Sequence, residues 1–233
     1  MNINQLKKKL DKAIYAREKG QLTESRILFE CLVKLIKEKI NGKPSKAVNF
    51  IYITIMAENI IQLRLEGQQK LRQALKLGQE LLNYDKKYKI NNPLSIRSVS
   101  NILADLGKYE MAKPFFKQMI QMYQNNSLRM GEAQAHLAYS FLRTGRAKEA
   151  NNLITLALKN IKANTAEEKY QEVRESYALI VQSLIYKTMG KIKDGKKIAK
   201  QALVIAQAGH ATHRIRQAKE NLSSFELKKT KLF

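Results

Sequence analysis

Apolar side chains recur along this chain at intervals of three and four residues, with polar residues between them. At the start of the chain Ile3, Leu6, Leu10 and Ile14 follow this spacing, and the same pattern returns at 215–225. Such spacing places the apolar groups on one face of an α-helix. Because it covers most of the sequence, it predicts an all-α fold.

One segment has the composition of a β-strand. Residues 49–55, NFIYITI, are β-branched and aromatic, as strand residues often are. The helical spacing continues through this segment without a break. We therefore expect it to be the buried part of a long helix.

Short polar segments separate the predicted helices and contain the Gly, Pro, Asn and Ser residues that end helices. These breaks fall at 41–46, 89–93, 124–127, 162–168 and 208–212. Pro93 suits the first turn of a helix, where its missing N–H would have no intrahelical partner anyway. Thr165 and Glu168 have the spacing of a capping box that would begin another helix.

A glycine returns at the end of several apolar stretches, and a small residue usually follows it five places later. The pairs are Gly20 with Ser25, Gly107 with Ala112, Gly145 with Ala150 and Gly190 with Gly195, while Gly67 marks a fifth break with Ala74 as its small partner. A glycine can take the positive φ that closes a helix. We expect the small residue to lie in the first turn of the next helix, where two antiparallel helices approach closely.

The glycines at 20, 67, 107, 145 and 190 recur at intervals of 38 to 47 residues. A repeat of this length made of helix, turn and helix is typical of a solenoid. We therefore expect about five helical pairs followed by a C-terminal helix. A non-repeating helical bundle is the alternative, because one helix pair carries little sequence information.

The repeat resembles the tetratricopeptide repeat (TPR) family most clearly at 96–119. There Gly107, Tyr109, Ala112 and Phe116 match the family's Gly-x-Tyr-x-x-Ala-x-x-x-Phe core. The resemblance covers roughly residues 3–208 and is to a long-repeat variant, since the usual TPR period is about 34 residues. It implies a right-handed α-solenoid, here a single domain over residues 1–227, followed by a basic tail at 228–233.

In the TPR family, the first helix of each pair lines a concave groove that binds peptides, which are often acidic or end in a carboxylate. The resemblance implies these groove positions here: Arg97, Asn101, Ala135, His136, Tyr139, Arg143, Tyr177, Leu184 and Lys187. Arg97 and Asn101, one helical turn apart, resemble half of a carboxylate clamp. A basic and aromatic surface of this kind suits acidic or hydrophobic peptides. The alternative interpretation is that these are ordinary solvated residues.

The chain is strongly basic, with 43 Lys and Arg against 20 Asp and Glu and a formal net charge of +23. Residues 187–233 contribute twelve basic and three acidic side chains to this surplus. Such a charge attracts polyanions, so a nucleic-acid-associated or transcription-regulatory protein is an alternative function. A genome rich in A and T would also supply many lysines without selection for binding. A self-assembling structural module, such as a homodimer, is a third alternative.

Few residues in the sequence are suited to catalysis. His210 and His213 could face the same side of a helix, but no third metal ligand and no general base lie near them. The single cysteine, Cys31, cannot form an intramolecular disulfide, and its apolar neighbours predict a buried helical position. We therefore expect a non-enzymatic binding scaffold without a metal or cofactor.

The longest apolar run, residues 50–57, is too short to span a bilayer, which requires about 20 residues. The N-terminal segment carries charged residues at 7–9 and at Asp11, where a signal peptide would have an apolar core. We expect a soluble, cytoplasmic protein that binds a protein or peptide partner and does not bind membranes.

Overall fold

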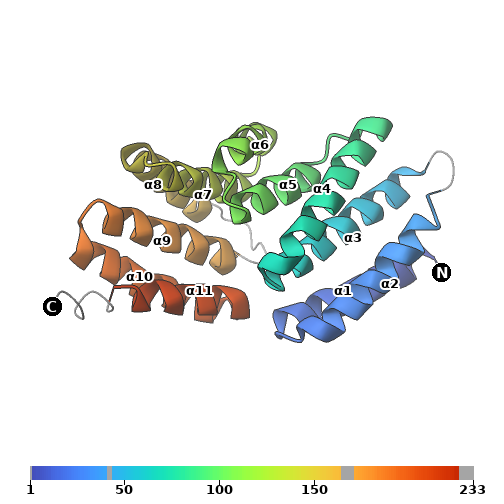
Figure 1. Ribbon diagram of the computed structural model, residues 1–233, viewed down its shortest axis with the longest axis horizontal. Coiled ribbons are helices and arrows are strands. Elements are labelled where there is room, and N and C mark those ends of the chain that lie inside the picture. Colours follow the sequence, from blue (N-terminus) through green and yellow to red (C-terminus); the bar gives the residue numbers. More distant parts are fainter. Residues whose placement is uncertain (1, 41–43, 164–170, 226–233) are drawn as a thin grey trace. The chain divides into compact units, whose positions relative to one another are not determined.

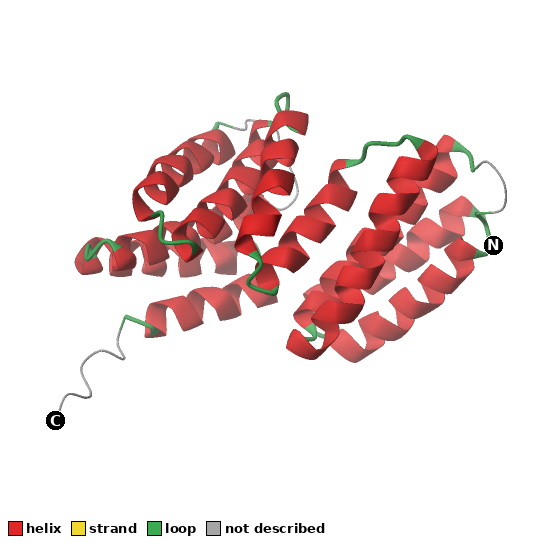
Figure 2. Ribbon diagram, turned by 45° about the horizontal axis from the view of Figure 1, so that its top comes forward, coloured by secondary structure: helices red, strands yellow, loops and turns green. Residues whose placement is uncertain are grey.

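The computed structural model describes residues 2–40, 44–163 and 171–225, which form α-helices joined by short turns (Figure 1; Figure 2). Eleven helices and no strand lie in these ranges. Their bounds are α1 Ile3–Glu18, α2 Leu22–Lys37, α3 Lys46–Leu65, α4 Gln68–Tyr88, α5 Pro93–Asp105, α6 Tyr109–Met122, α7 Ser127–Arg143, α8 Ala147–Lys162, α9 Gln171–Thr188, α10 Ile192–Ala208 and α11 Thr212–Ser223. The predicted fold class, an all-α solenoid of five helical pairs and a final helix, is confirmed.

The recurring glycines close helices as predicted. Gly20, Gly107, Gly145 and Gly190 have φ values of 79°, 73°, 80° and 77°, and Gly67 has a φ of 101°. After Gly20, Gly107, Gly145 and Gly190 the next residue donates its N–H to the carbonyl five residues earlier, as from Gln21 to Ala16 at 2.9 Å. This pairing satisfies a carbonyl at the helix end that would otherwise lack a partner.

The small residues after these glycines lie where helices approach closely. Ser25, Ala112 and Ala150 are fully buried. The Ser25 hydroxyl donates to the Ala13 carbonyl of the preceding helix at 2.9 Å. At Gly195 an added Cβ would lie 3.2 Å from the Ser183 carbonyl oxygen. Each position therefore excludes a large side chain, as the sequence pattern predicted.

The segment at 49–55 is helical, as predicted, and lies inside α3. Between Ile51 and Leu63, α3 is buried around its circumference, including Ile51, Tyr52, Ile53 and Ile55. The reason is that α1, α2, α4 and α5 all pack against this helix. Its apolar positions therefore follow no single stripe, and its composition resembles that of a buried strand.

The chain divides into two compact units, Met1–Lys108 and Tyr109–Phe233, which we call the first and second units. In the first unit, Leu6, Phe29, Ile55 and other buried residues of α1–α5 form one apolar core. In the second unit, α7–α11 contribute a core of their own that includes Ile154 and Ile185. The single domain expected over residues 1–227 stays a prediction, and the tail at 228–233 lies outside the described residues.

Polar caps begin several helices. Asn92 caps α5 by accepting the Leu94 N–H at 2.9 Å, and Pro93 occupies the first turn as predicted. Asn126 caps α7 in the same way through the Arg129 N–H. The capping box expected at Thr165 and Glu168 lies outside the described residues.

The expected burial of Cys31 is wrong, because this cysteine is exposed on α2. The buried stripe of α2 contains Phe29, Leu32 and Ile36, at intervals of three and four residues. Because a helix turns by about 100° per residue, the side chain of Cys31, two residues after Phe29, points about 200° away from that stripe. The apolar composition of the surrounding segment concealed this periodicity.

Candidate functional site

The predicted groove positions of the second unit lie mainly on α7 and α9. Residues 131–138 of α7 are all buried, because α6, α8 and α9 pack against this helix. Gly131 allows α7 and α8 to approach each other closely, since an added Cβ would lie 2.7 Å from the Ala157 carbonyl oxygen of α8. Ala135, an expected groove residue, is fully buried here and contributes no surface.

His136 lies in a column of stacked side chains that joins four helices. Its ring is nearly parallel to that of Phe116 on α6, with ring centroids 5.5 Å apart. The ring centroids of His136 and Tyr177 of α9 are 4.3 Å apart. The Arg214 guanidinium of α11 in turn lies 4.4 Å from the centroid of the Tyr177 ring. His136 is only 8% exposed. It therefore packs between helices, while Tyr177 and Arg214 lie closer to the surface.

A buried ion pair lies one helical turn before His136. The Arg174 Nε donates to the Glu132 carboxylate at 3.0 Å, and both side chains are buried between α9 and α7. A buried charge that loses its partner is strongly destabilising, so this pair fixes how the two helices meet. Neither residue belongs to the groove positions predicted from the sequence. Their separation of 42 residues matches the repeat length, which is the only signal that could have paired them.

Three side chains form what we call the Tyr–Arg cluster: Tyr109, Tyr139 and Arg143. The rings of Tyr109 and Tyr139 meet edge to face with centroids 6.0 Å apart. The Arg143 guanidinium lies 5.5 Å from the Tyr109 ring centroid and 6.0 Å from that of Tyr139. Arg143 is exposed, whereas both tyrosines are half-buried. The rings therefore position a cation at the surface through cation–π contacts.

Two other cations of α6 and of the turn before α8 are already paired. Arg146 donates two hydrogen bonds to the Glu149 carboxylate and lies 4.4 Å from the Phe141 ring centroid. Lys113 pairs with Glu110 in the same helix. The hydrogen bonds from Arg146 lower the pKa of Glu149. Among the described residues Arg143 makes no such ion pair, which distinguishes it from Arg146 and Lys113.

The other predicted groove residues have varied surroundings. Lys187 donates to the carbonyl and hydroxyl oxygens of Ser224 at 2.7 and 2.8 Å, so it holds the end of α11. Leu184 is half-buried against the core of the second unit. In the first unit Arg97 is half-buried on α5, and Asn101 one turn later is buried. Of the predicted set, His136 and Tyr177 are in direct contact, as are Tyr139 and Arg143.

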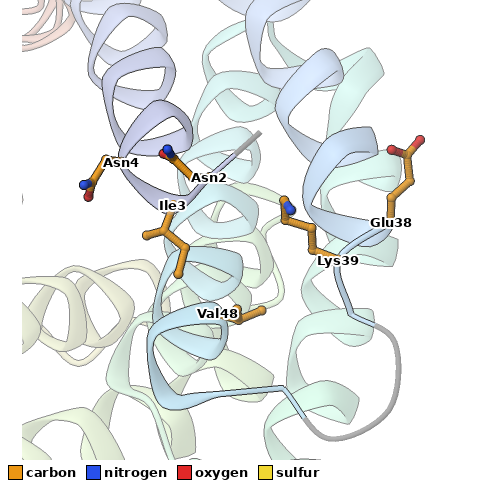
Figure 3. Close-up of a pocket in the computed structure, with 6 residues that line it drawn as sticks. All are labelled: Asn2, Ile3, Asn4, Glu38, Lys39 and Val48. Carbon is orange, nitrogen blue, oxygen red and sulfur yellow. The ribbon is translucent and has the colours of Figure 1, made fainter.

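A surface pocket of the first unit lies between the start of α1, the end of α2 and the start of α3 (Figure 3). Asn2, Ile3, Asn4, Glu38, Lys39 and Val48 line it. The Lys39 side chain points toward Asn2, whereas the Glu38 carboxylate points away from the pocket (Figure 3). The lining combines amides with aliphatic groups, and its one carboxylate is turned outward.

Two further properties bear on function. Within the described residues, no group of three or more His, Cys, Asp or Glu side chains is arranged to hold a metal ion. Within the described ranges, none of the helices combines the length with the hydropathy that a membrane span requires.

Comparisons with known proteins identify the fold. No protein-family model matches the sequence, and no curated protein matches it either. Among solved structures, the nearly identical TPR-like repeats of a protein described as a kinesin light chain of Podosopora anserina match with a TM-score of 0.61 and 15% identity over 89% of this chain and 98% of that chain. A variant of that protein matches with a TM-score of 0.62 and 15% identity, covering 88% and 97%.

A third structure, BtubC (BKLC) from P. vanneervenii, matches with a TM-score of 0.53 and 14% identity, covering 90% of this chain and 89% of that chain. At these identities the likeness establishes the fold. The resemblance to TPR proteins that the sequence predicted is therefore confirmed at the level of a TPR-like helical repeat.

Proposed function

We propose that this chain is a non-enzymatic interaction protein that binds an acidic segment of a partner protein at the Tyr–Arg cluster of the second unit. TPR-like repeat folds generally mediate protein interactions, which supports a binding role over catalysis. The single observation that carries the proposal is the state of Arg143, which is exposed, held against two tyrosine rings and not paired with a carboxylate among the described residues.

The chemistry of this cluster favours a carboxylate ligand. A guanidinium that lies against aromatic rings uses its flat face, so its N–H edge stays available for two parallel hydrogen bonds to a carboxylate. Tyrosine and arginine are also the residues most enriched among those that dominate binding energy at protein interfaces. The tyrosine rings limit the motion of Arg143, which reduces the entropy that a ligand must overcome.

The experiment is affinity capture from a cell extract with the full chain as bait, at moderate salt and after nuclease treatment. We expect one protein partner, and a peptide scan of that partner should locate an acidic segment. Arg143→Ala should weaken binding of this segment at least tenfold, which corresponds to about 1.4 kcal/mol. Tyr139→Ala should act in the same direction because it removes one ring beneath the guanidinium.

The matched control is Lys148→Ala, which removes one exposed positive charge on α8. It should leave the affinity within about twofold. An equal loss in Lys148→Ala and Arg143→Ala would mean that net charge alone drives binding, and the proposal would be wrong. Retention of nucleic acid alone, lost on nuclease treatment, would instead favour the nucleic-acid-associated function. A cytoplasmic location completes the proposal, since a single cysteine forms no intramolecular disulfide.

A further inference from the structure

The outward face of α10 carries a stripe of positive charge. The side of this helix that faces the core is built from small buried residues: Gly195, Ala199, Ala202 and Ala206. On the opposite side, four exposed residues follow one another at intervals of four, three and four residues, and we call them the lysine stripe: Lys193, Lys197, Lys200 and Val204. Figure 1 shows α10 beside α9 and α11 in the second unit.

The three lysines of the stripe are electrostatically uncompensated. Within the described part of the chain none of their ammonium groups forms an ion pair or a side-chain hydrogen bond. Lys193 lies in the first turn of α10, where the helix dipole already disfavours positive charge. Lys193 and Lys197 are also four residues apart, a spacing at which like charges repel. The only acid in this first turn is Asp194, which projects from the flank of the stripe.

The spacing of the stripe selects the kind of partner. Intervals of four and three residues place side chains along the seam where two helices pack, with a mean repeat of about 3.5 residues. The fourth member, Val204, lies on the same face of α10 as the lysines, and its side chain is 62% exposed. A nucleic acid would attract the lysines through its phosphates, but its charged backbone presents a mostly polar surface to the valine. A partner helix can supply both chemistries on one face.

We propose that the lysine stripe docks an acidic amphipathic helix of a partner protein, with carboxylates opposite the three lysines and an apolar side chain opposite Val204. This surface is separate from the Tyr–Arg cluster, which lies on α6 and α7. Because the contacts are exposed ion pairs, binding is weak and salt-dependent. Each of the two sites can be removed without touching the other.

The probe is a fluorescent synthetic helical peptide that carries Glu at three positions of a four–three–four stripe and Leu at the fourth, made in both orders along the helix. Its control has the same composition with the glutamates placed off the stripe. Binding to the full chain is measured by fluorescence anisotropy at low and moderate salt. We expect the striped peptide in one order to bind at least fivefold more tightly than its control.

Variants of the full chain then locate the site. The triple variant Lys193→Gln, Lys197→Gln, Lys200→Gln should weaken binding at least tenfold, and Val204→Gln about threefold. The matched control is Lys117→Gln, Lys148→Gln, Lys159→Gln, which removes three exposed lysines of α6 and α8 and the same total charge. It should change the affinity less than twofold. All these positions are exposed, and circular dichroism checks that each variant keeps its helices.

Two results would overturn the proposal. One is an equal loss of binding in both triple variants, or equal binding of the striped and control peptides, since either means that total charge alone attracts the peptide. The other comes from a duplex DNA probe run in parallel. If the DNA binds more tightly than the peptide, and the stripe variant abolishes this binding while Val204→Gln does not, the stripe is a nucleic-acid surface.

Discussion

At the residue scale, two glycines inside helices lie against different kinds of neighbouring atom. An added Cβ at Gly131 of α7 would lie 2.7 Å from the Ala157 carbonyl oxygen and 2.7 Å from Cγ1 of Ile161. At Gly78 of α4 the nearest atom would be Cγ2 of Val99, at 2.9 Å. A side-chain methyl group can move by a small rotation, whereas the carbonyl is held in the hydrogen bonding of α8. The two sites therefore differ in how well they can relax.

We predict that Gly131→Ala destabilises the protein by about 1–3 kcal/mol, the usual cost of overpacking a filled interior. Gly78→Ala should cost less, because the Val99 methyl can rotate away from the added Cβ. The preference of roughly 1 kcal/mol for alanine over glycine in a helix interior applies at both positions. Urea denaturation followed by circular dichroism measures both free energies of unfolding. Equal stability of Gly131→Ala and the parent chain would show that α7 and α8 can move apart at little cost.

Glycines at helix ends can be predicted from the local sequence, whereas contacts between helices cannot. Gly107 and Gly145 were placed at helix ends because each follows the last apolar residue of a helical stretch, and such a local pattern is readable in one dimension. The neighbours of His136 were not readable, since Phe116 and Tyr177 come from other helices. Ala135 was assigned to the groove by its place in the repeat, although several helices surround it.

At the element scale, the α3–α4 interface is built on tyrosines. The rings of Tyr52 and Tyr84 have centroids 4.1 Å apart, and the Tyr84 hydroxyl donates to Oδ1 of Asn49 at 2.6 Å. Burial raises the pKa of Tyr84 to about 12, with smaller contributions from Tyr88 and Asp85. Burial, followed by the charge of Glu80, raises the pKa of Tyr52 as well.

These raised pKa values predict that the protein loses stability in alkali. The unfolded chain releases its phenolic protons near pH 10, while the folded chain holds those of Tyr84 until about pH 12. Between these values the folded state binds more protons, so the free energy of unfolding falls as pH rises. Below pH 10 the contribution is fully present. Urea midpoints measured from pH 9 to 11.5 should therefore fall less steeply in Tyr84→Phe than in the parent chain.

The control for this prediction is Tyr15→Phe, which removes a tyrosine hydroxyl from an exposed position on α1. Its urea midpoints should follow the same pH dependence as those of the parent chain. If Tyr84→Phe also follows the parent chain, then the α3–α4 interface does not hold the phenolic proton of Tyr84. The alkaline loss would in that case come from other groups.

The elements themselves were largely predictable, and their contacts were not. Caps such as Asn92 with Pro93, and apolar spacings such as Leu6 and Leu10 of α1, are local signals that fixed the type and approximate bounds of the helices. The Glu132–Arg174 pair joins α7 to α9 across 42 residues. Nothing in the local sequence distinguishes these two side chains from the many other charged residues of the chain. Their partners depend on which helix faces meet.

At the scale of the whole molecule, the division at Lys108 and Tyr109 makes a prediction about folding. Each apolar core of the described residues lies within one unit. Each unit also has more than 100 residues, a size at which a single core usually suffices for stability. We predict that fragments 1–108 and 109–233, produced separately, each fold into helical proteins with cooperative urea transitions. A fragment without such a transition would not be an independent folding unit.

The same fragments bear on where binding occurs. The Tyr–Arg cluster and the lysine stripe both lie in the second unit, so fragment 109–233 should bind the acidic segment and the striped peptide within about twofold of the full chain. The resemblance to TPR proteins also implied a role for Arg97 and Asn101, which belong to the first unit. If fragment 109–233 folds but binds the acidic segment at least tenfold more weakly, those α5 residues become the next positions to replace. Because the striped peptide uses a separate surface, its affinity should remain unchanged in that case and would serve as the internal control.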